Sequence, residues 1–188
     1  MELRDLLPLV REKCQGMLDR QAIDHLKKAY RKFCIESKFV IRKQTVDKVA
    51  NELTLTPDAG YYILDVLSVD DIDGRDLTKG THYIVTDNRE ITLVEGIDKA
   101  VVTFSIAPIL PISDSVAIEQ RILERWPDEL AAGAASTLRK MPSQEWTDFS
   151  LSQHYQREFV EGYREAFQER VSDIDNSKLN QSSKRVFY

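Results

Sequence analysis

Apolar residues recur every three or four positions near the start of the chain, and this period predicts amphipathic helices. The clearest helical stretch starts at Asp19, a residue type that caps helix N-termini well. Its apolar positions are Ala22, Ile23, Leu26, Ala29, Tyr30, Phe33 and Cys34. A shorter helix is predicted over residues 3–17. Because proline disrupts a helix interior, this helix must begin or kink near Pro8, and Gly16 is expected to end it. Its apolar side consists of Leu6, Leu7 and Val10.

The pattern changes to that of strands between about Ser37 and Leu110, where short β-branched or aromatic runs alternate with turn residues. The predicted strands are 39–46, 52–56, 60–70, 82–86, 90–95 and 100–107. Their turn signals are Asp73-Gly74, Asp87-Asn88 and Glu95-Gly96-Ile97-Asp98. In the last run Val101, Thr103 and Ser105 alternate with Val102, Phe104 and Ile106. This alternation predicts an antiparallel sheet with at least one buried face.

The helical period returns beyond Pro111. A helix capped by Asp114 or Ser115 is expected to run to about Lys140. Its predicted inward stripe is Ile118, Ile122, Leu123, Trp126, Leu130, Ala134 and Leu138. Pro127 interrupts this run, so a kink or break is expected near Trp126. The following residues, 130–135, include Gly133 and Ala134 and are nearly all small, which lets another backbone approach closely.

The last predicted helix opens at Thr147-Asp148 and runs from about Phe149 to Ile174. Its stripe is Leu151, Tyr155, Phe159, Tyr163, Ala166, Phe167 and Val171, and this aromatic content fits packing against the two N-terminal helices. Residues 175–188 are polar until the chain closes with Val186-Phe187-Tyr188. This segment has too little apolar surface to fold alone, so a flexible tail is predicted.

Together these patterns predict an α+β fold with a helical bundle made from both chain ends, residues 1–36 and 114–174. The bundle carries an inserted antiparallel β domain over residues 37–110. Closely spaced strands with tight turns favour a small sandwich or open barrel for this domain over a parallel α/β sheet.

Composition limits the classes of protein to consider. The 188 residues allow one domain or one domain with a compact insertion, and a hydrophobic share of 42% excludes wholesale disorder. No apolar run approaches the roughly 18 to 20 residues that a membrane-spanning helix needs. The N-terminus has no cationic stretch followed by an apolar block, so no secretory signal is expected. We therefore expect synthesis in the cytoplasm and no membrane partner.

The net charge of −5 is unevenly distributed along the chain. Residues 1–50 contain 12 basic and 7 acidic side chains, whereas residues 51–188 contain 14 basic and 24 acidic ones. Lys27-Lys28 and Arg31-Lys32 form a basic strip on one predicted helix, and such a strip can contact phosphates. We favour a solvated helix face, because the overall acidity opposes tight binding of nucleic acid.

No catalytic or cofactor motif stands out. The patterns GxSxG, GxxxxGK[ST] and GxGxxG are absent, and 31 acidic residues give no basis for selecting one catalytic pair. The cysteines, Cys14 and Cys34, and the histidines, His25, His82 and His154, form no metal-binding motif. The glycine of the acidic run 70–76 comes too early for an EF-hand, so a solvated β-turn is expected there. Trp146 is expected to fill a corner between helices rather than to stack on a ligand. We expect no metal, no cofactor and no enzymatic activity.

Four segments resemble tailed-bacteriophage head-to-tail adaptor proteins. These segments are residues 3–10, residues 29–37, residues 131–148, and the run from Tyr155 through Gly162 to Ala166. Their order and spacing match over about residues 3–170. The small-residue helix followed by Met-Pro and then Trp is the most specific part of the resemblance.

The resemblance implies a dodecameric ring under the portal that joins head to tail and continues the DNA channel in the virion neck. The helical part would form the ring body, with Gly133, Ala134, Trp126 and Trp146 in helix-packing and ring contacts. The β insertion would face outward or towards tail components. The tail, Lys184, Arg185, Val186, Phe187 and Tyr188, would dock on the portal.

The implied partners are further copies of the chain, the portal protein, tail or nozzle proteins, and passing double-stranded DNA contacted without sequence specificity. Alternative interpretations are another neck ring, such as a stopper or tail-completion protein, and less strongly a small DNA-binding regulator or a small hydrolase.

Overall fold

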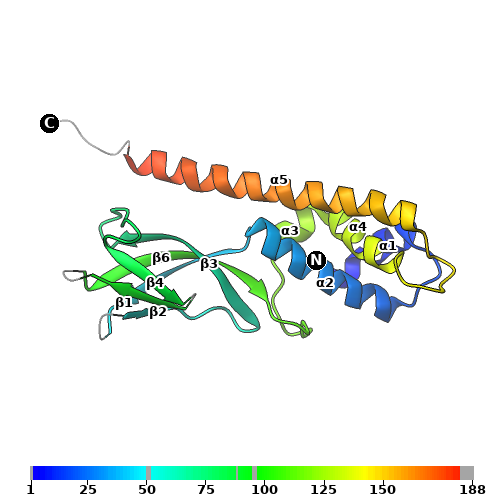
Figure 1. Cartoon of the computed structure of the whole chain (residues 1–188), viewed down its shortest axis with the longest axis horizontal. Coiled ribbons are helices and arrows are strands. Elements are labelled where there is room, and N and C mark those ends of the chain that lie inside the picture. Colours follow the sequence, from blue (N-terminus) through cyan, green and yellow to red (C-terminus); the bar gives the residue numbers. More distant parts are fainter. Residues whose placement is uncertain (1, 50–51, 88, 95–96, 183–188) are drawn as a thin grey trace. The chain divides into compact units, whose positions relative to one another are not determined.

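The structure, a computed structural model, describes residues 2–49, 52–87, 89–94 and 97–182. Helices make up 44% of the chain and strands 26%, and the strands form two antiparallel sheets, so the predicted α+β class is confirmed (Figure 1). Contacts divide the chain into two units. The helical unit contains Met1–Ser37 and Leu110–Glu169, and the β unit contains Lys38–Ile109 and Arg170–Tyr188.

The helical unit begins with a short 3₁₀ helix, η1 (Leu3–Leu6), followed by α1 (Leu7–Lys13). Pro8 lies in the first turn of α1, where its missing N–H costs no helical hydrogen bond. The predicted start near Pro8 is therefore confirmed, but the helix ends at Lys13 and not near residue 17. Gly16 lies in the loop that follows, with a φ of +84° that favours glycine.

Helix α2 (Asp19–Ser37) starts where the sequence predicts it. Six of its seven predicted apolar positions are buried: Ala22, Leu26, Ala29, Tyr30, Phe33 and Cys34. The seventh, Ile23, is partly exposed because it lines a surface cavity.

The predicted break at Trp126 is confirmed, because it separates α3 (Gln120–Arg125) from α4 (Pro127–Leu138). The predicted start at Asp114 or Ser115 is wrong, since residues 113–119 form no α-helix. Asp114 accepts a hydrogen bond from the Lys27 ammonium, 2.9 Å away, and the Glu119 N–H donates to the Tyr30 hydroxyl at 2.9 Å. These contacts with α2 hold the segment from Asp114 to Glu119 in a loop.

Helix α5 (Phe149–Ser182) is longer than predicted. The expected end at Ile174 is wrong, and residues 175–182 of the predicted flexible tail continue the helix. Lys184, Arg185, Val186, Phe187 and Tyr188 lie outside the described residues.

The buried face of α5 is also rotated from the predicted one. Leu151, Phe167 and Val171 are 37%, 40% and 37% exposed. Its buried positions are Ser152, Phe159, Gly162, Ala166 and Arg170. Glycine and serine occupy this face because α4 approaches it closely, and a search for large apolar side chains does not detect such positions.

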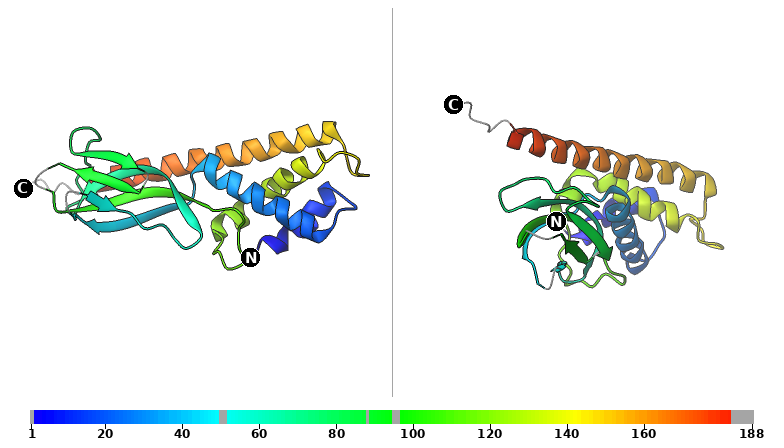
Figure 2. Two further views of the ribbon diagram at one scale, coloured as in Figure 1. Left: turned by 60° about the horizontal axis from the view of Figure 1, so that its bottom comes forward. Right: turned by 60° about the vertical axis from the view of Figure 1, so that its left-hand side comes forward.

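The strands of the β unit are drawn in cyan to green in Figure 2. All six predicted strands are confirmed, with their ends shifted by at most two residues. One sheet has the order β1-β6-β3 and the other the order β2-β5-β4, with antiparallel pairing throughout. The first sheet contains β1 (Ile41–Asp47), β6 (Lys99–Pro108) and β3 (Tyr61–Asp71). The second sheet contains β2 (Glu52–Thr54), β5 (Glu90–Leu93) and β4 (Tyr83–Asp87).

The predicted alternation in β6 is confirmed, since Val102, Phe104 and Ile106 are buried. The predicted turn at Asp73-Gly74 is also present, with the Gly74 N–H donating to the Asp71 carbonyl at 2.9 Å. This turn belongs to the acidic run 70–76, in which Asp70 and Asp76 form an isolated antiparallel bridge on either side of the turn. The other two predicted turns include residues outside the described ranges.

Candidate functional site

Helices α4 and α5 contact each other through two glycines, one on each helix. A Cβ added to Gly133 of α4 would lie 2.6 Å from Cδ2 of Phe159 on α5. A Cβ added to Gly162 of α5 would lie 2.5 Å from Cγ of Glu129 on α4. Each glycine therefore leaves a hole that a side chain of the other helix fills. The approach at Gly133 is as close as the small residues suggested, but an aromatic ring makes it, not a backbone.

Helix α4 is buried on nearly all sides because α1, α2 and α5 surround it. It contacts α1 and α2, and Phe159 brings α5 against it. Its buried residues are Leu130, Ala131, Ala132, Gly133, Ala134, Ala135, Ser136 and Leu138. Gly133, Ala134 and the buried Trp126 therefore make contacts inside the chain.

Arg139 joins the ends of three helices just after α4. Its Nε and Nη2 donate to the carbonyl of Lys13 at 2.8 and 2.5 Å, and its Nη1 donates to the carbonyl of Trp146 at 3.4 Å. The guanidinium also lies 5.8 Å from the ring centre of Tyr155 on α5. It thus satisfies a carbonyl at the end of α1, where no helical partner is available.

Trp146 lies in the loop between α4 and α5, and it is apart from the buried cluster of Trp126, Gly133 and Ala134. Its indole covers Gly16, since a Cβ on that glycine would lie 3.5 Å from Cε3 of Trp146. The loop before α5 and the loop before α2 are therefore packed together at this end of the helical unit.

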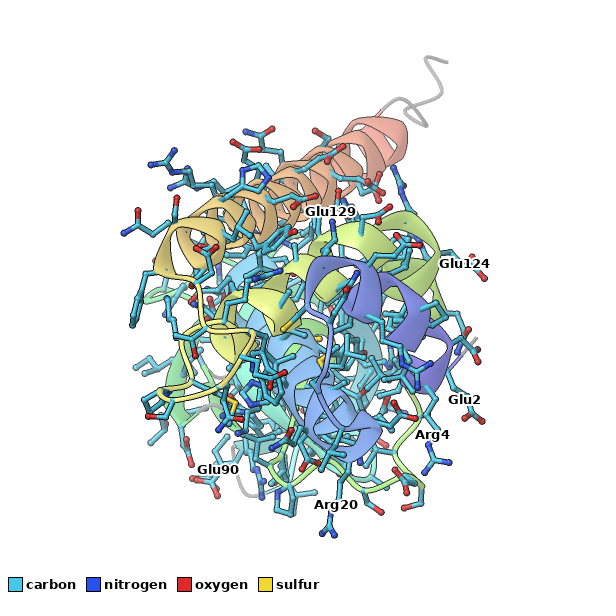
Figure 3. The ribbon with its side chains drawn as sticks, turned by 90° about the vertical axis from the view of Figure 1, so that its right-hand side faces the viewer. Glu2, Arg4, Arg20, Glu90, Glu124 and Glu129 are labelled. Carbon is cyan, nitrogen blue, oxygen red and sulfur yellow. The ribbon has the colours of Figure 1, made fainter. Side chains whose placement is uncertain are left out.

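Glu129 occupies an unfavourable position for an acid. It is half-buried against Gly162 between α4 and α5 (Figure 3), and it forms no ion pair with any described residue. Burial raises the pKa of the Glu129 carboxyl above its ordinary value, and the charges of Asp128, Glu165 and Glu158 raise it further. Lys13 lies on the same side of α5, but its ammonium pairs with Glu158 at 3.2 Å.

A cavity of about 320 Å³ lies between η1, α2 and residues 112–120. The Lys27 ammonium donates there to the Ile112 carbonyl at 2.8 Å and to Asp114 Oδ1 at 2.9 Å. Arg4 lies 3.9 Å from the same carboxylate. The hydrogen bond and charge of Lys27 hold the pKa of Asp114 below its ordinary value. Lys27 of the predicted basic strip is thus bound within the chain, while Lys28 and Lys32 remain exposed.

The described residues include no group of three or more His, Cys, Asp or Glu side chains placed to hold a metal ion. Cys14 and Cys34 are free and buried, and burial raises the pKa of Cys34 to about 12, which keeps its thiol protonated. Within the described ranges, no helix combines the length and apolar character needed to span a bilayer.

Phe159, Gly162, Glu129 and Arg139 form the contacts between α4, α5 and the end of α1. Phe159 was predicted to pack, as part of the aromatic stripe of the last helix, whereas Gly162, Glu129 and Arg139 were not selected from the sequence as contact residues. A signal for Gly162 was present, because a glycine inside a helix weakens it unless a close neighbour requires the missing side chain. The partners in these contacts are distant in sequence and have no such signal.

No protein-family model matches the chain, and no curated protein sequence matches it.

Replacing Gly133 with leucine is expected to lower the melting temperature of the protein by about 5 °C or more, because overpacking a core costs about 1–3 kcal/mol. The Phe159 ring has little room to retreat, since it contacts Phe33 and Tyr163 at centroid distances of 6.2 and 5.5 Å. Circular dichroism during heating measures the effect. Adding Phe159→Leu to Gly133→Ala should recover part of the stability that Gly133→Ala alone loses. If Gly133→Leu melts at the same temperature as the wild type, the close contact between Gly133 and the Phe159 ring is contradicted.

The raised pKa of Glu129 predicts a pH dependence of stability. The folded chain binds the Glu129 proton more tightly than the unfolded chain, whose pKa is near 4.5. The free energy of unfolding therefore falls as the pH rises through 4.5 to the folded pKa, and this loss is complete above it. The Glu129→Gln variant has no titratable group at this position, so its free energy of unfolding should not show this fall with rising pH.

At pH 7.5 this variant should melt about 2 °C above the wild type, and near pH 4 the difference should shrink. Glu145→Gln, at an exposed loop position, is the control and should change neither value. If Glu129→Gln and the wild type melt at the same temperature at pH 7.5, burial of the Glu129 carboxylate does not lower the folding stability.

Proposed function

We propose that the protein is a structural adaptor of a tailed-bacteriophage virion, whose copies form a ring under the portal and continue the DNA channel towards the tail. One observation carries this proposal. The four segments that resemble adaptor proteins are distant in sequence, yet all of them belong to the helical unit.

These segments also contact one another. Residues 3–10 form η1 and the first part of α1, and residues 131–148 form most of α4 and the loop that follows. Phe33, in the α2 segment, contacts the Phe159 ring of the α5 segment at 6.2 Å. Gly133 receives the same ring. The resemblance is thus concentrated in one packed set of helices and is not scattered over unrelated surfaces.

In this proposal the helical unit is a bundle formed by both chain ends, and it serves as the ring body. The β strands form an insertion that faces outward or towards tail proteins. The function depends on shape and position, without turnover of a substrate. In such a ring an acidic channel wall would repel the phosphate backbone and let DNA slide.

Electron microscopy of the protein mixed with the portal protein of the same genome tests this proposal. We expect a closed ring stacked directly on the portal, with twelve subunits. Absence of any ring at micromolar concentrations of both proteins would contradict the proposal. A ring found one layer further down in the particle neck would identify a stopper or tail-completion protein instead.

Deleting residues 184–188 should leave the melting temperature unchanged but weaken attachment to the portal by about tenfold or more, because aromatic anchors such as Phe187 and Tyr188 dominate many interfaces. These residues lie outside the described ranges. Co-sedimentation with the portal measures the attachment. A control variant that replaces the five residues with glycine and serine separates their chemistry from tail length. Unchanged attachment of both variants would remove the docking role.

A further inference from the structure

The cavity beside α2 combines an apolar lining with a rim whose cations already face a carboxylate. Its volume is about 320 Å³, and its apolar lining consists of Leu3, Ile23, Ile112, Val116 and Ile118. At the rim, Lys27 and Arg4 both approach Asp114, at 2.9 and 3.9 Å. The other polar residues around it are Glu2, Ser113 and Gln120. Because its cations already approach Asp114, the cavity suits an uncharged side chain.

Hydrogen bonds to α2 fix the outer wall of this cavity, which is formed by residues 112–119. The Lys27 ammonium donates to the Ile112 carbonyl at 2.8 Å, and the Glu119 N–H donates to the Tyr30 hydroxyl at 2.9 Å. Both ends of the wall are thus bound to α2, so the cavity is part of the folded unit. An apolar cavity of about 150 Å³ already holds a benzene molecule, so this one has room for an aromatic side chain.

Phe149, the first residue of α5, is an exposed aromatic side chain on a fixed backbone. It is 64% exposed. The Asp148 N–H donates to the Arg139 carbonyl at 3.0 Å, and the Asp148 carboxylate accepts from the Leu151 N–H at 2.9 Å. These bonds hold the start of α5 in place. A rigid aromatic group loses little conformational freedom when it enters a pocket, and such groups dominate many interfaces.

The flank of α5 that carries Phe149 is uncharged over about three turns. Gln153, Gln156 and Val160 follow Phe149 at steps of four, three and four residues, so all four lie on one flank. Gln153 is exposed, and Gln156 and Val160 are partly exposed. Arg157, one turn after Gln153, borders this strip. The strip therefore presents one large apolar side chain with amide neighbours, which can bind polar groups at a cavity rim.

The cavity and the start of α5 lie on opposite sides of the helical unit. Ile23 and Lys27 of α2 line the cavity. His25 is two residues from each of them and so lies on the opposite face of α2, where it contacts Thr137 of α4 at 2.7 Å. Figure 3 shows Arg4, at the cavity rim, on one side of the helical unit and the start of α5 on the other.

The two features also lie at the same level along the helices. The Ser152 hydroxyl of α5 donates to the carbonyl of Ser136, which is adjacent to the Thr137 that His25 contacts. Phe149 lies within one turn of Ser152, and the cavity-lining residues of α2 lie within one turn of His25. A contact between the two features of different copies therefore adds little displacement along the helices. If the helices run along the axis of the assembly, this favours a closed ring over an open filament.

We infer that the phenyl group of Phe149 in one copy enters the cavity of a second copy. This inference rests on the proposed ring, and it names the contact between neighbouring subunits. Because the phenyl group and the cavity lie on opposite sides of one unit, each copy inserts Phe149 into one neighbour and receives Phe149 from the other. An apolar anchor in a pocket with a polar rim is the common arrangement at the centre of protein interfaces.

Thiol cross-linking tests this pairing on the full-length protein in the presence of the portal. One chain carries Gln153→Cys, next to the retained Phe149, and the other carries Ser113→Cys at the cavity rim; both positions are exposed. The native thiols, Cys14 and Cys34, are buried and should not react. A short cross-linker that joins two thiols should link the mixed chains into a dimer.

Two control samples separate this pairing from random collision. Gln153→Cys alone should give little dimer, because two copies of the α5 strip do not meet. A mixture of Leu151→Cys and Ser113→Cys should also give little, since Leu151 is exposed on the opposite face of α5. In each control we expect at least about tenfold less dimer than in the mixture of Gln153→Cys and Ser113→Cys.

Assembly on the portal gives a second measurement. Phe149→Gln removes the phenyl group, and Val116→Trp fills the cavity. Each should form at least about tenfold fewer rings than the wild type in electron micrographs, because loss of an aromatic anchor strongly weakens an interface. Circular dichroism checks folding, and Gln120→Trp fills the cavity from an exposed rim position if Val116→Trp does not fold. Leu151→Gln is the control and should assemble normally.

The specific dimer together with the loss of rings supports the inference. Absence of this dimer from a sample that does form rings would overturn it and leave the adaptor proposal intact. Normal ring formation by Phe149→Gln and by the filled-cavity variant would have the same meaning. If only the filled cavity prevents attachment, the cavity binds the portal and the inference is wrong. Absence of rings from the wild type would overturn both proposals.

Discussion

The helical unit depends on two positions in its α4–α5 contact where a Cβ atom does not fit. Gly133 admits the ring of Phe159, and Gly162 admits the side chain of Glu129. Since each glycine belongs to a different helix, the two helices hold each other at a short separation. The Phe159 ring then reaches Phe33 on α2, so this one close contact connects the last helix of the chain to an early one. Larger side chains at either glycine would separate these elements.

This close packing decides which residues remain available for function. Helix α4 has the smallest side chains of the helical unit, and its small-residue stretch is buried inside the chain. The residues that resemble an adaptor most specifically are therefore mainly structural, whereas the exposed surface belongs to α2, α5 and the loops. Arg139 strengthens this arrangement because it binds carbonyls at Lys13 and Trp146.

Glu129 lowers the stability of the folded helical unit at neutral pH, because its carboxyl is half-buried next to other acids. A neutral side chain of similar size would fill the space next to Gly162 without the penalty of burying a carboxylate. Proteins keep such locally unfavourable groups mainly where function benefits from them. Here the acid is half-buried against Gly162 and forms no ion pair with a described residue.

The sequence alone determined the elements whose evidence is local. Helix α2, all six strands and the break at Trp126 follow from hydrophobic period, turn residues and proline, which act within a few residues. Only the tertiary structure decided the start of α3, the buried face of α5 and the partners of Gly133 and Glu129. Asp114 has the chemistry of a helix cap, but Lys27 of α2 binds it in a loop. Such outcomes depend on residues distant in the chain, and a period read along the sequence contains no information about which side chain fills a distant glycine.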